Sequence, residues 1–238
     1  MNQFKEEYLG VKVSALNYAE ILSEIDNRIQ EGEQSTVIAV NPEKVIKAQD
    51  DPEIKRLINE STFQIPDGAG ILLASRLKKG KIRNRVTGID MMDHLLGHAS
   101  KQGYRVFFYG AKEEIVKKAR DNIKEKYPAL HVAGYANGYI KDNDALIEEI
   151  NKTKADIVFV AMGSPRQEYW IEQNRAQLNA KVFQGVGGSF DVFSGTIPRA
   201  PHLFRRLGLE WLYRLMKEPS RWKRQMALPK FLVKVLRG

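Results

Sequence analysis

An acidic residue at the end of an apolar stretch offers this chain a site for acid–base chemistry. Asp67 stands between Pro66 and Gly68, directly after the short strand expected over Phe63-Gln-Ile-Pro66. A carboxylate placed there is suited to act as a general base, because it can accept the proton of a substrate hydroxyl. The same residue type is also a common N-cap of a following helix. The residues alone leave both roles open for Asp67.

A basic segment follows Asp67. Lys79, Lys81 and Arg83 precede Arg85, with no acidic residue among them. Such a patch suits a diphosphate, because charge-assisted hydrogen bonds from guanidinium and ammonium groups are strong. An arginine in solvent is the commoner case, so Arg85 also has a plain surface interpretation.

Two glycine-containing turns could bind an anionic ligand. The first reads Gly163-Ser-Pro-Arg-Gln-Glu168, which combines a tight turn with a Pro suited to the first turn of a helix. A helix N-terminus favours anions, and the Gln167 amide can hydrogen-bond a sugar or a diphosphate. A plain start of the helix expected from Tyr169 is the alternative. The candidate ligand-binding residues here are Gly163, Ser164, Arg166, Gln167 and Glu168.

The second turn, Gly185-Val-Gly-Gly-Ser-Phe-Asp191, packs three glycines into four positions after an apolar run. Glycines allow the backbone to turn sharply and to approach a ligand closely. We interpret Gly187 and Gly188 as the end of a core strand that opens onto a phosphate-bearing ligand. Asp191 could accept a hydrogen bond from a ribose or sugar hydroxyl, or it could cap a turn.

The elements that must position these residues alternate between strand and helix. Apolar stretches expected to be strands lie at residues 36–40, 63–66, 105–109, 131–133, 156–161 and 181–183, and helical periodicity follows most of them. This order predicts an α/β fold, with a mostly parallel sheet and helices on both faces. Ligands bind such sheets at the carboxyl ends of the strands. Asn41, Gly110 and Tyr135 lie at expected strand ends and join the candidate ligand-binding residues.

The charge of the chain is distributed unevenly. Up to Gly195 there are 27 Lys+Arg and 27 Asp+Glu, whereas from Thr196 onward there are 11 Lys+Arg and two acids, so the net charge of +9 belongs to the tail. We expect an α/β core over residues 1–195 and a basic helical appendage over residues 196–238. The chain has no cysteine, which excludes disulfides and thiolate catalysis. It has no signal peptide and no apolar run of about 20 residues, so we expect a cytoplasmic protein.

The tail alternates large apolar and basic residues at helical spacing, with Trp211 and Trp222 among them. Basic, Trp-bearing amphipathic helices suit an anionic membrane surface. Two ordinary helices packed on the core, or a nucleic-acid patch, are the alternatives. Arg214, Arg221 and Arg224 lie on stretches that could fold back over an active site and bind a lipid diphosphate.

Two metal-like patterns are better explained without a metal. Asp142-Asn-Asp144 has the spacing of a manganese site, but it stands before a helix, where capping is the better interpretation. His94 and His98 are one helical turn apart, yet no third strong ligand accompanies them. We therefore expect no metal and no cofactor.

Five motifs give the chain a resemblance to a known family: Pro66-Asp-Gly-Ala-Gly70, Arg85-Val-Thr-Gly-Ile-Asp90, Gly163-Ser-Pro-Arg-Gln-Glu168, Val186-Gly-Gly-Ser-Phe-Asp-Val-Phe-Ser-Gly195 and Gly208-Leu-Glu-Trp-Leu-Tyr-Arg214. In this order the chain resembles the WecG/TagA/CpsF glycosyltransferases over nearly its whole length. One departure is Ala39 before Val40-Asn41-Pro42, where the family often has Thr, so a hydroxyl contact is absent there.

The resemblance implies a Rossmann-like fold of the GT-E type and an inverting, metal-independent transfer of N-acetylmannosamine. The donor would be a UDP-sugar, and the acceptor N-acetylglucosamine on a membrane-embedded polyprenyl diphosphate, as in the linkage unit of wall teichoic acid. Asp67, Arg85 and Gln167 would be the catalytic residues. The resemblance also implies a peripheral position on the inner face of the plasma membrane. Another UDP-sugar donor, such as UDP-ManNAcA or UDP-glucose, and a homo-oligomeric state stay open.

Two other classes of function fit the sequence less well. A nicotinamide dehydrogenase needs Gly-x-Gly-x-x-Gly after its first strand, whereas the glycine-rich turn of this chain comes at the end of the sheet. A non-enzymatic RNA-binding module would explain the basic tail but not the polar clusters at the strand ends. We therefore expect no nucleic-acid partner.

Overall fold

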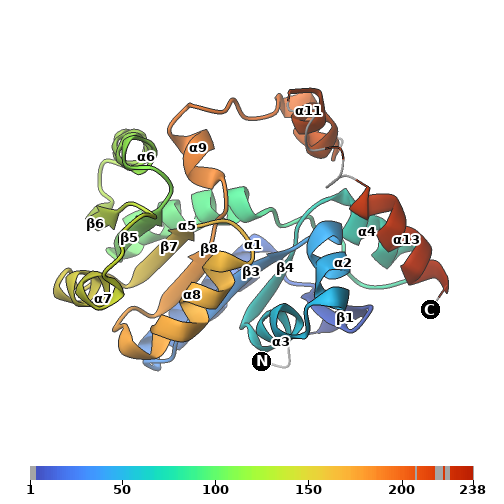
Figure 1. Cartoon of the computed structure of the whole chain (residues 1–238), viewed down its shortest axis with the longest axis horizontal. Helices are drawn as coiled ribbons and strands as arrows, with labels where there is room; N and C mark the ends of the chain where they lie inside the picture. The colour runs from blue at the N-terminus through green and yellow to red at the C-terminus, as the bar shows by residue number, and fades with distance from the viewer. Residues whose placement is uncertain (1–3, 207, 218–221, 223–225, 238) are drawn as a thin grey trace. The chain divides into compact units, whose positions relative to one another are not determined.

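The computed structural model describes residues 4–206, 208–217, 222 and 226–237. Figure 1 shows the strands and helices in their order along the chain. The described elements are β1 (Lys5–Tyr8), β2 (Val11–Ser14), α1 (Tyr18–Gln30), β3 (Ser35–Val40), α2 (Pro42–Asp50), α3 (Pro52–Glu60), β4 (Phe63–Pro66), α4 (Ala69–Leu77), α5 (Gly88–Gln102), β5 (Arg105–Gly110), α6 (Glu113–Lys126), β6 (His131–Ala136), α7 (Asn143–Lys152), β7 (Ile157–Ala161), α8 (Arg166–Asn174), the 3-10 helix η1 (Arg175–Gln177), β8 (Val182–Gly185), α9 (Ser189–Phe193), α10 (His202–Arg206), α11 (Glu210–Lys217) and α13 (Ala227–Arg237).

Six strands form one sheet in the order β4-β3-β8-β7-β5-β6. The paired strands β3 and β8, β8 and β7, β7 and β5, and β5 and β6 all run parallel. Strands β7 and β8 are buried along their whole length, as strands covered on both faces must be. The predicted α/β class with a mostly parallel sheet is confirmed.

The chain divides into two compact units. Unit 1 contains residues 1–17, 39–87 and 199–238, and unit 2 contains residues 18–38 and 88–198. The backbone passes from one unit to the other within β3. The tail thus belongs to the same compact unit as Asp67, a grouping that charge alone did not indicate. The assignment of residues 196–238 as a membrane appendage stays a prediction.

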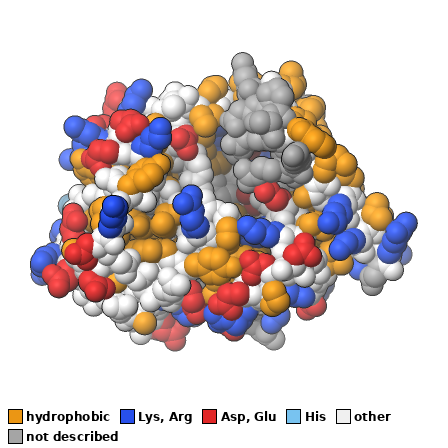
Figure 2. Space-filling model, viewed as in Figure 1, with side chains coloured by type: hydrophobic (Ala, Val, Ile, Leu, Met, Phe, Trp, Pro, Cys, Tyr) orange, Lys and Arg blue, Asp and Glu red, His pale blue; other side chains and the backbone are white. Residues whose placement is uncertain are grey.

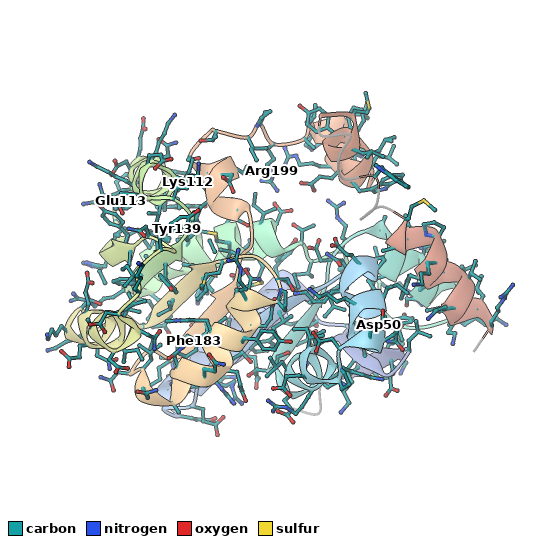
Figure 3. The ribbon with its side chains drawn as sticks, in the orientation of Figure 1. Asp50, Lys112, Glu113, Tyr139, Phe183 and Arg199 are labelled. Carbon is teal, nitrogen blue, oxygen red and sulfur yellow. The ribbon has the colours of Figure 1, made fainter. Side chains whose placement is uncertain are left out.

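Unit 2 buries apolar side chains on both faces of its strands. Phe107, Val158 and Phe183 point to the face covered by α7 and α8, where they form one buried cluster with Trp170 and Leu146. Phe183 is labelled within this unit in Figure 3. On the other face Phe108 stacks on Phe159 and meets the ring of Phe190 edge-on. Both layers are fully buried, so the strand ends that carry polar residues are held rigidly.

The described core of unit 1 contains the β1–β2 hairpin, β4 and the helices α2, α3, α4 and α13. The Ser14 hydroxyl donates to the Gln64 carbonyl at 2.9 Å and joins β2 to β4. Helix α13 packs on α2 and α4. Its Phe231 side chain is fully buried, and the centre of the Phe231 ring lies 6.0 Å from the centre of the Tyr8 ring. The end of the tail is therefore part of the hydrophobic core of this unit.

The Glu6 carboxylate ties the hairpin to the basic segment after α4. It accepts hydrogen bonds from the Ile82 N–H at 2.8 Å, from the Ser75 hydroxyl at 3.2 Å, and from the Lys81 N–H and the Tyr8 hydroxyl. Burial raises the pKa of Glu6, but the hydrogen bonds from Tyr8, Ile82, Lys81 and Ser75 outweigh it, and its pKa lies below the ordinary 4.5. The charged form is thus the one that holds the segment.

We expect Glu6→Gln to lower the free energy of unfolding by about 1–2 kcal/mol at pH 7. A hydrogen bond to a charged group is worth more than one to a neutral group, but the partial exposure of Glu6 to solvent reduces its contribution. Because the folded pKa is depressed, this contribution is present above pH 4.5 and is lost as the pH falls through the folded pKa. Urea denaturation at pH 7 and pH 3 measures both values. The exposed neighbour Glu7→Gln is the control, and an equal loss at both pH values would contradict the assignment.

Two predicted boundaries were wrong. The strand expected at residues 131–133 continues as β6 to Ala136, so Tyr135 lies inside a strand, paired with Phe108. Gly134 looked like a break, but a Cβ there would lie 2.7 Å from the Phe107 ring, so glycine is needed for packing. The helix expected from Tyr169 begins earlier, as α8 at Arg166.

Candidate active site

Asp67 lies at the carboxyl end of β4, in the turn that leads into α4. Its N–H donates to the Val40 carbonyl at 2.9 Å, which joins the turn to the end of β3. The N-cap of α4 is Gly68, which has a φ of +92° and contributes no side-chain cap. Only glycine adopts that conformation without strain. The N-cap position that the sequence left open for Asp67 is therefore occupied by Gly68.

Arg85 is brought beside this turn by the backbone and is held by an acidic partner. The Val86 N–H donates to the Pro66 carbonyl at 3.0 Å, so residues 85–86 run next to the Asp67 turn. The Arg85 guanidinium lies 3.8 Å from the Glu210 carboxylate, with the side chains only 18% and 11% exposed. Glu210 is the first residue of α11 and carries negative charge where a helix favours it. Glu210 lies within the motif at residues 208–214 but was not among the predicted site residues.

Two points of the tail contact the start of α4. A Cβ on Gly208 would lie 3.1 Å from the Ala69 Cβ, and one on Gly70 would lie 2.5 Å from the Leu228 side chain. Residues before α11 and at the start of α13 thus flank the turn that carries Asp67. Arg214 lies one turn beyond Glu210 in α11. The side chain of Arg214, and the whole of Arg221 and Arg224, fall outside the described residues.

Asn41 also lies at the carboxyl end of β3, but its side chain has a local task. Its amide oxygen accepts the Lys44 N–H at 2.9 Å and caps α2, whose first residue is Pro42. This is the start signal that Asn-Pro predicts. Binding of substrate by Asn41 stays a prediction, with the amide nitrogen as the group to carry it.

In unit 2, Gln167 joins the two predicted glycine-containing turns. Its Oε1 accepts the Gly187 N–H at 2.9 Å, and its Nε2 donates to Glu168 Oε1 at 3.1 Å. Both side chains are buried, and the Gln167 N–H closes the first turn on the Gly163 carbonyl at 3.0 Å. Residues 163–168 and 185–188 are therefore brought together, as their predicted places at strand ends require.

Gly185 leaves the space that the Gln167 side chain occupies. A Cβ at this position would lie 2.6 Å from Gln167 Nε2. We expect Gly185→Ala to displace this side chain and to raise the KM for the ligand that the two turns are predicted to bind about tenfold or more, since one lost hydrogen bond to a charged group corresponds to about 1.5–3 kcal/mol. Gly97→Ala, whose Cβ would find only an ordinary contact at 3.4 Å, is the control. Steady-state kinetics decides, and an unchanged KM would contradict this role of Gln167.

Gly110 and Tyr135 lie at or near the carboxyl ends of β5 and β6. Gly110 ends β5 with a φ of +119°, and a Cβ there would lie 2.4 Å from the Ala161 carbonyl oxygen. The Arg120 guanidinium lies 4.5 Å from the centre of the Tyr135 ring. Lys112, Glu113 and Tyr139 lie near the start of α6 in Figure 3, and the Tyr139 side chain is 70% exposed.

Ser164, Arg166, Gly188 and Asp191 complete the predicted set in unit 2. Arg166 is the first residue of α8, and Ser164 belongs to the closed turn before it. Gly188 precedes α9, and a Cβ there would lie 3.4 Å from Asp191 Oδ2. The Asp191 carbonyl accepts the Ile197 N–H at 3.0 Å and fixes the chain beyond α9.

The two metal-like patterns have structural roles. Asp142 caps α7 by accepting the Ala145 N–H at 3.0 Å, which confirms the capping interpretation. His98 Nε2 lies 2.8 Å from Asp26, whereas His94 stacks on Tyr18 at 4.3 Å between ring centres. Among the described residues, no cluster of three or more His, Cys, Asp or Glu side chains could hold a metal ion.

Comparison with known proteins assigns the chain to a family. The model described as "Glycosyl transferase WecG/TagA/CpsF family" matches residues 6–238. The chain belongs to the WecG/TagA/CpsF glycosyltransferase family. The predicted family is thus confirmed, and the match extends through the tail that packs into unit 1.

Two relatives carry the same name, N-acetylglucosaminyldiphosphoundecaprenol N-acetyl-beta-D-mannosaminyltransferase. The one from Bacillus subtilis is 40% identical over 203 residues, which are 85% of this chain and 79% of the relative. The one from Bacillus spizizenii is 38% identical over 201 residues, which are 84% of this chain and 78% of the relative. Both relatives therefore match most of the length of this chain.

Proposed function

We propose that this chain transfers N-acetylmannosamine from a UDP donor to N-acetylglucosamine on a polyprenyl diphosphate, the reaction of the wall teichoic acid linkage unit. Both relatives are named for a transfer to N-acetylglucosaminyldiphosphoundecaprenol. The observation that carries the proposal is the Asp67 turn, where a carboxylate follows the carboxyl end of β4 and the backbone of residues 85–86 runs beside it.

In the proposed reaction Asp67 accepts the proton of the acceptor 4-hydroxyl as its oxygen attacks C1 of the donor sugar. The bond from C1 to the UDP oxygen breaks, and UDP leaves with the electron pair. A single displacement of this kind inverts the configuration at C1. The reaction needs a base for the hydroxyl and stabilisation of the leaving diphosphate.

We assign the stabilisation of the leaving diphosphate to Arg85 and the glycine-containing turns. The Arg85 guanidinium is mostly buried, which strengthens its attraction for a phosphate. We assign the donor to the turns that Gln167 joins, at residues 163–168 and 185–188, with Gly110, Tyr135 and Asp191 as further contacts. The acceptor diphosphate is assigned to Arg214, Arg221 and Arg224.

We also infer that the protein acts at the inner face of the plasma membrane, where a polyprenyl-linked acceptor would be found. In the described part of the chain, no helix has the length and apolar character needed to cross a bilayer. The support lies in the tail, where Trp222 and Met226 are 56% and 55% exposed and the cations outnumber the acids. Such a surface suits peripheral attachment to anionic lipid.

A thermal-shift screen tests the class of ligand. UDP should raise the melting temperature by several degrees at saturating concentration, because a ligand that binds only the folded state stabilises it by about 2.7 kcal/mol at 100 times Kd. NAD and RNA oligonucleotides should leave it unchanged. A shift with NAD or RNA and none with UDP would contradict the proposed donor.

We expect transfer to proceed unchanged in EDTA. Asp142, the first carboxylate of the manganese-like pattern, already accepts a backbone N–H at 3.0 Å. Stabilisation of the leaving UDP is then assigned to Arg85 and backbone N–H groups. Initial rates with and without EDTA measure this, and activity that is lost in EDTA and restored by manganese would overturn the assignment.

A further inference from the structure

The outer side of α4 presents apolar and basic side chains that the packing of unit 1 does not use. Leu73 and Leu77, one helical turn apart, are 43% and 51% exposed, whereas Ile71 and Ala74 on the inner side are fully buried. Arg76 lies on the same outer side and is also exposed. The helix thus has a solvent-facing stripe of two leucines and an arginine.

The segment after α4 extends this stripe with charge of one sign. Residues 68–89 contain six cations and no acidic residue. Lys78 and Lys81 are exposed, and Lys81 Nζ lies 4.4 Å from the centre of the Phe4 ring, itself 46% exposed. We call Phe4, Leu73, Arg76, Leu77, Lys78 and Lys81 the α4 surface.

The Glu6 carboxylate stabilises this arrangement. Although it is an acid next to these cations, it accepts hydrogen bonds from the backbone N–H groups of Lys81 and Ile82 and from the Ser75 hydroxyl. The hydrogen bonds fix the loop that carries Lys81 and place it beside β1. The α4 surface is therefore preformed from two separate parts of unit 1.

Helix α13 lies beside α4 and exposes a similar combination of side chains. Leu228 at its start contacts the position of Gly70, and α13 packs along α4. Val233 and Leu236 are 47% and 58% exposed, with Lys230 and Lys234 also exposed. Blue and orange side chains cover the α13 end in Figure 2, whereas blue and red mix over α6 and α7.

We propose that the α4 surface is a second contact with an anionic phospholipid membrane, beside the contact assigned to the tail. Leucine and phenylalanine side chains insert at the boundary of headgroups and acyl chains, and surface cations attract anionic headgroups. A second copy of this chain fits less well, because a symmetric contact would bring like charges together. The inference rests on the proposed function only for the membrane setting of the substrate.

Vesicle sedimentation with full-length variants tests the proposal. Arg76→Gln/Lys78→Gln should weaken binding to phosphatidylglycerol/phosphatidylcholine vesicles by roughly 10–30-fold, since each cation near such a surface is worth about fivefold. Lys117→Gln/Lys118→Gln on α6 makes the same change of net charge and should bind like the wild type. Leu73→Ser/Leu77→Ser should also weaken binding, with melting temperature measured as a check on folding.

Two results would overturn the proposal. An equal loss in the α6 control would show that net charge alone governs binding. Unchanged vesicle binding, together with a changed oligomeric state by light scattering, would assign the α4 surface to a contact between copies. Transfer to a short-chain acceptor without vesicles separates the two proposals. The variants should keep wild-type rates there, whereas a wild-type protein with no transfer would refute the proposed function and leave the vesicle result standing.

Discussion

Asp67→Asn should lower the rate of sugar transfer by about 10²–10⁴-fold, which is roughly 3–5 kcal/mol of activation free energy. Asparagine has the size of aspartate and can keep the backbone hydrogen bond to Val40, because that bond uses the N–H of residue 67. It cannot take the proton of the acceptor hydroxyl. Initial rates with a short-chain lipid acceptor measure the loss.

The fold should survive this substitution. The N-cap position of α4 is Gly68, and asparagine can keep the backbone hydrogen bond of residue 67, so we expect little loss of stability. The melting temperature and the stabilisation by UDP should stay near wild-type values. Near-wild-type turnover would refute Asp67 as the base, whereas a large fall in melting temperature would show that its role is structural.

Arg221→Glu and Arg224→Glu, made singly, should each lower transfer to a soluble acceptor by about tenfold or more, as should Arg214→Glu. An arginine bound to a phosphate makes a charge-assisted, often bidentate contact, and a reversed charge repels the same group. Residues 218–226 lie between α11 and α13 in the sequence, and both helices contact unit 1 near the Asp67 turn. Glu210 pairs with Arg85, and Leu228 contacts the position of Gly70.

Single substitutions are a better test here than removal of the tail. Phe231 and Val235 of α13 are buried, so truncation from Thr196 would expose core surface of unit 1. Lys234→Glu is the matched control, because Lys234 is an exposed cation of the same tail. If all four variants retain full activity with the soluble acceptor and lose only vesicle binding, the three arginines serve the membrane and not the acceptor diphosphate.

Local patterns predicted the parts of the fold that depend on neighbours in sequence. Asn41-Pro42 predicted the start of α2, and the apolar run before Gly185 predicted β8. Helix capping and strand burial depend on a few adjacent residues, so a local pattern is enough to indicate them. The candidate residues Asp67, Gly110 and Gly163 lie at or just after strand ends for the same reason. Their chemical roles stay predictions.

Contacts between residues far apart in the chain could not be predicted from the sequence. Strand β1 has the polar sequence Lys-Glu-Glu-Tyr, and only the contacts of Glu6 with residues 75–82 explain its place. Glu210 gains its importance from Arg85, which is far away in the chain. The expected strand stopped before Gly134, because the Phe107 ring that this glycine accommodates belongs to another strand.

A mass-spectrometric transfer assay is the most direct test of the proposed activity. The protein is incubated with a synthetic N-acetylglucosaminyl lipid diphosphate and, in parallel, with UDP-N-acetylmannosamine, UDP-N-acetylglucosamine, UDP-ManNAcA or UDP-glucose. The account predicts that UDP-N-acetylmannosamine adds one N-acetylhexosamine unit to the acceptor, that the other donors add little, and that Asp67→Asn adds none. Transfer from another of these donors in preference, or no transfer from any of them, would contradict it.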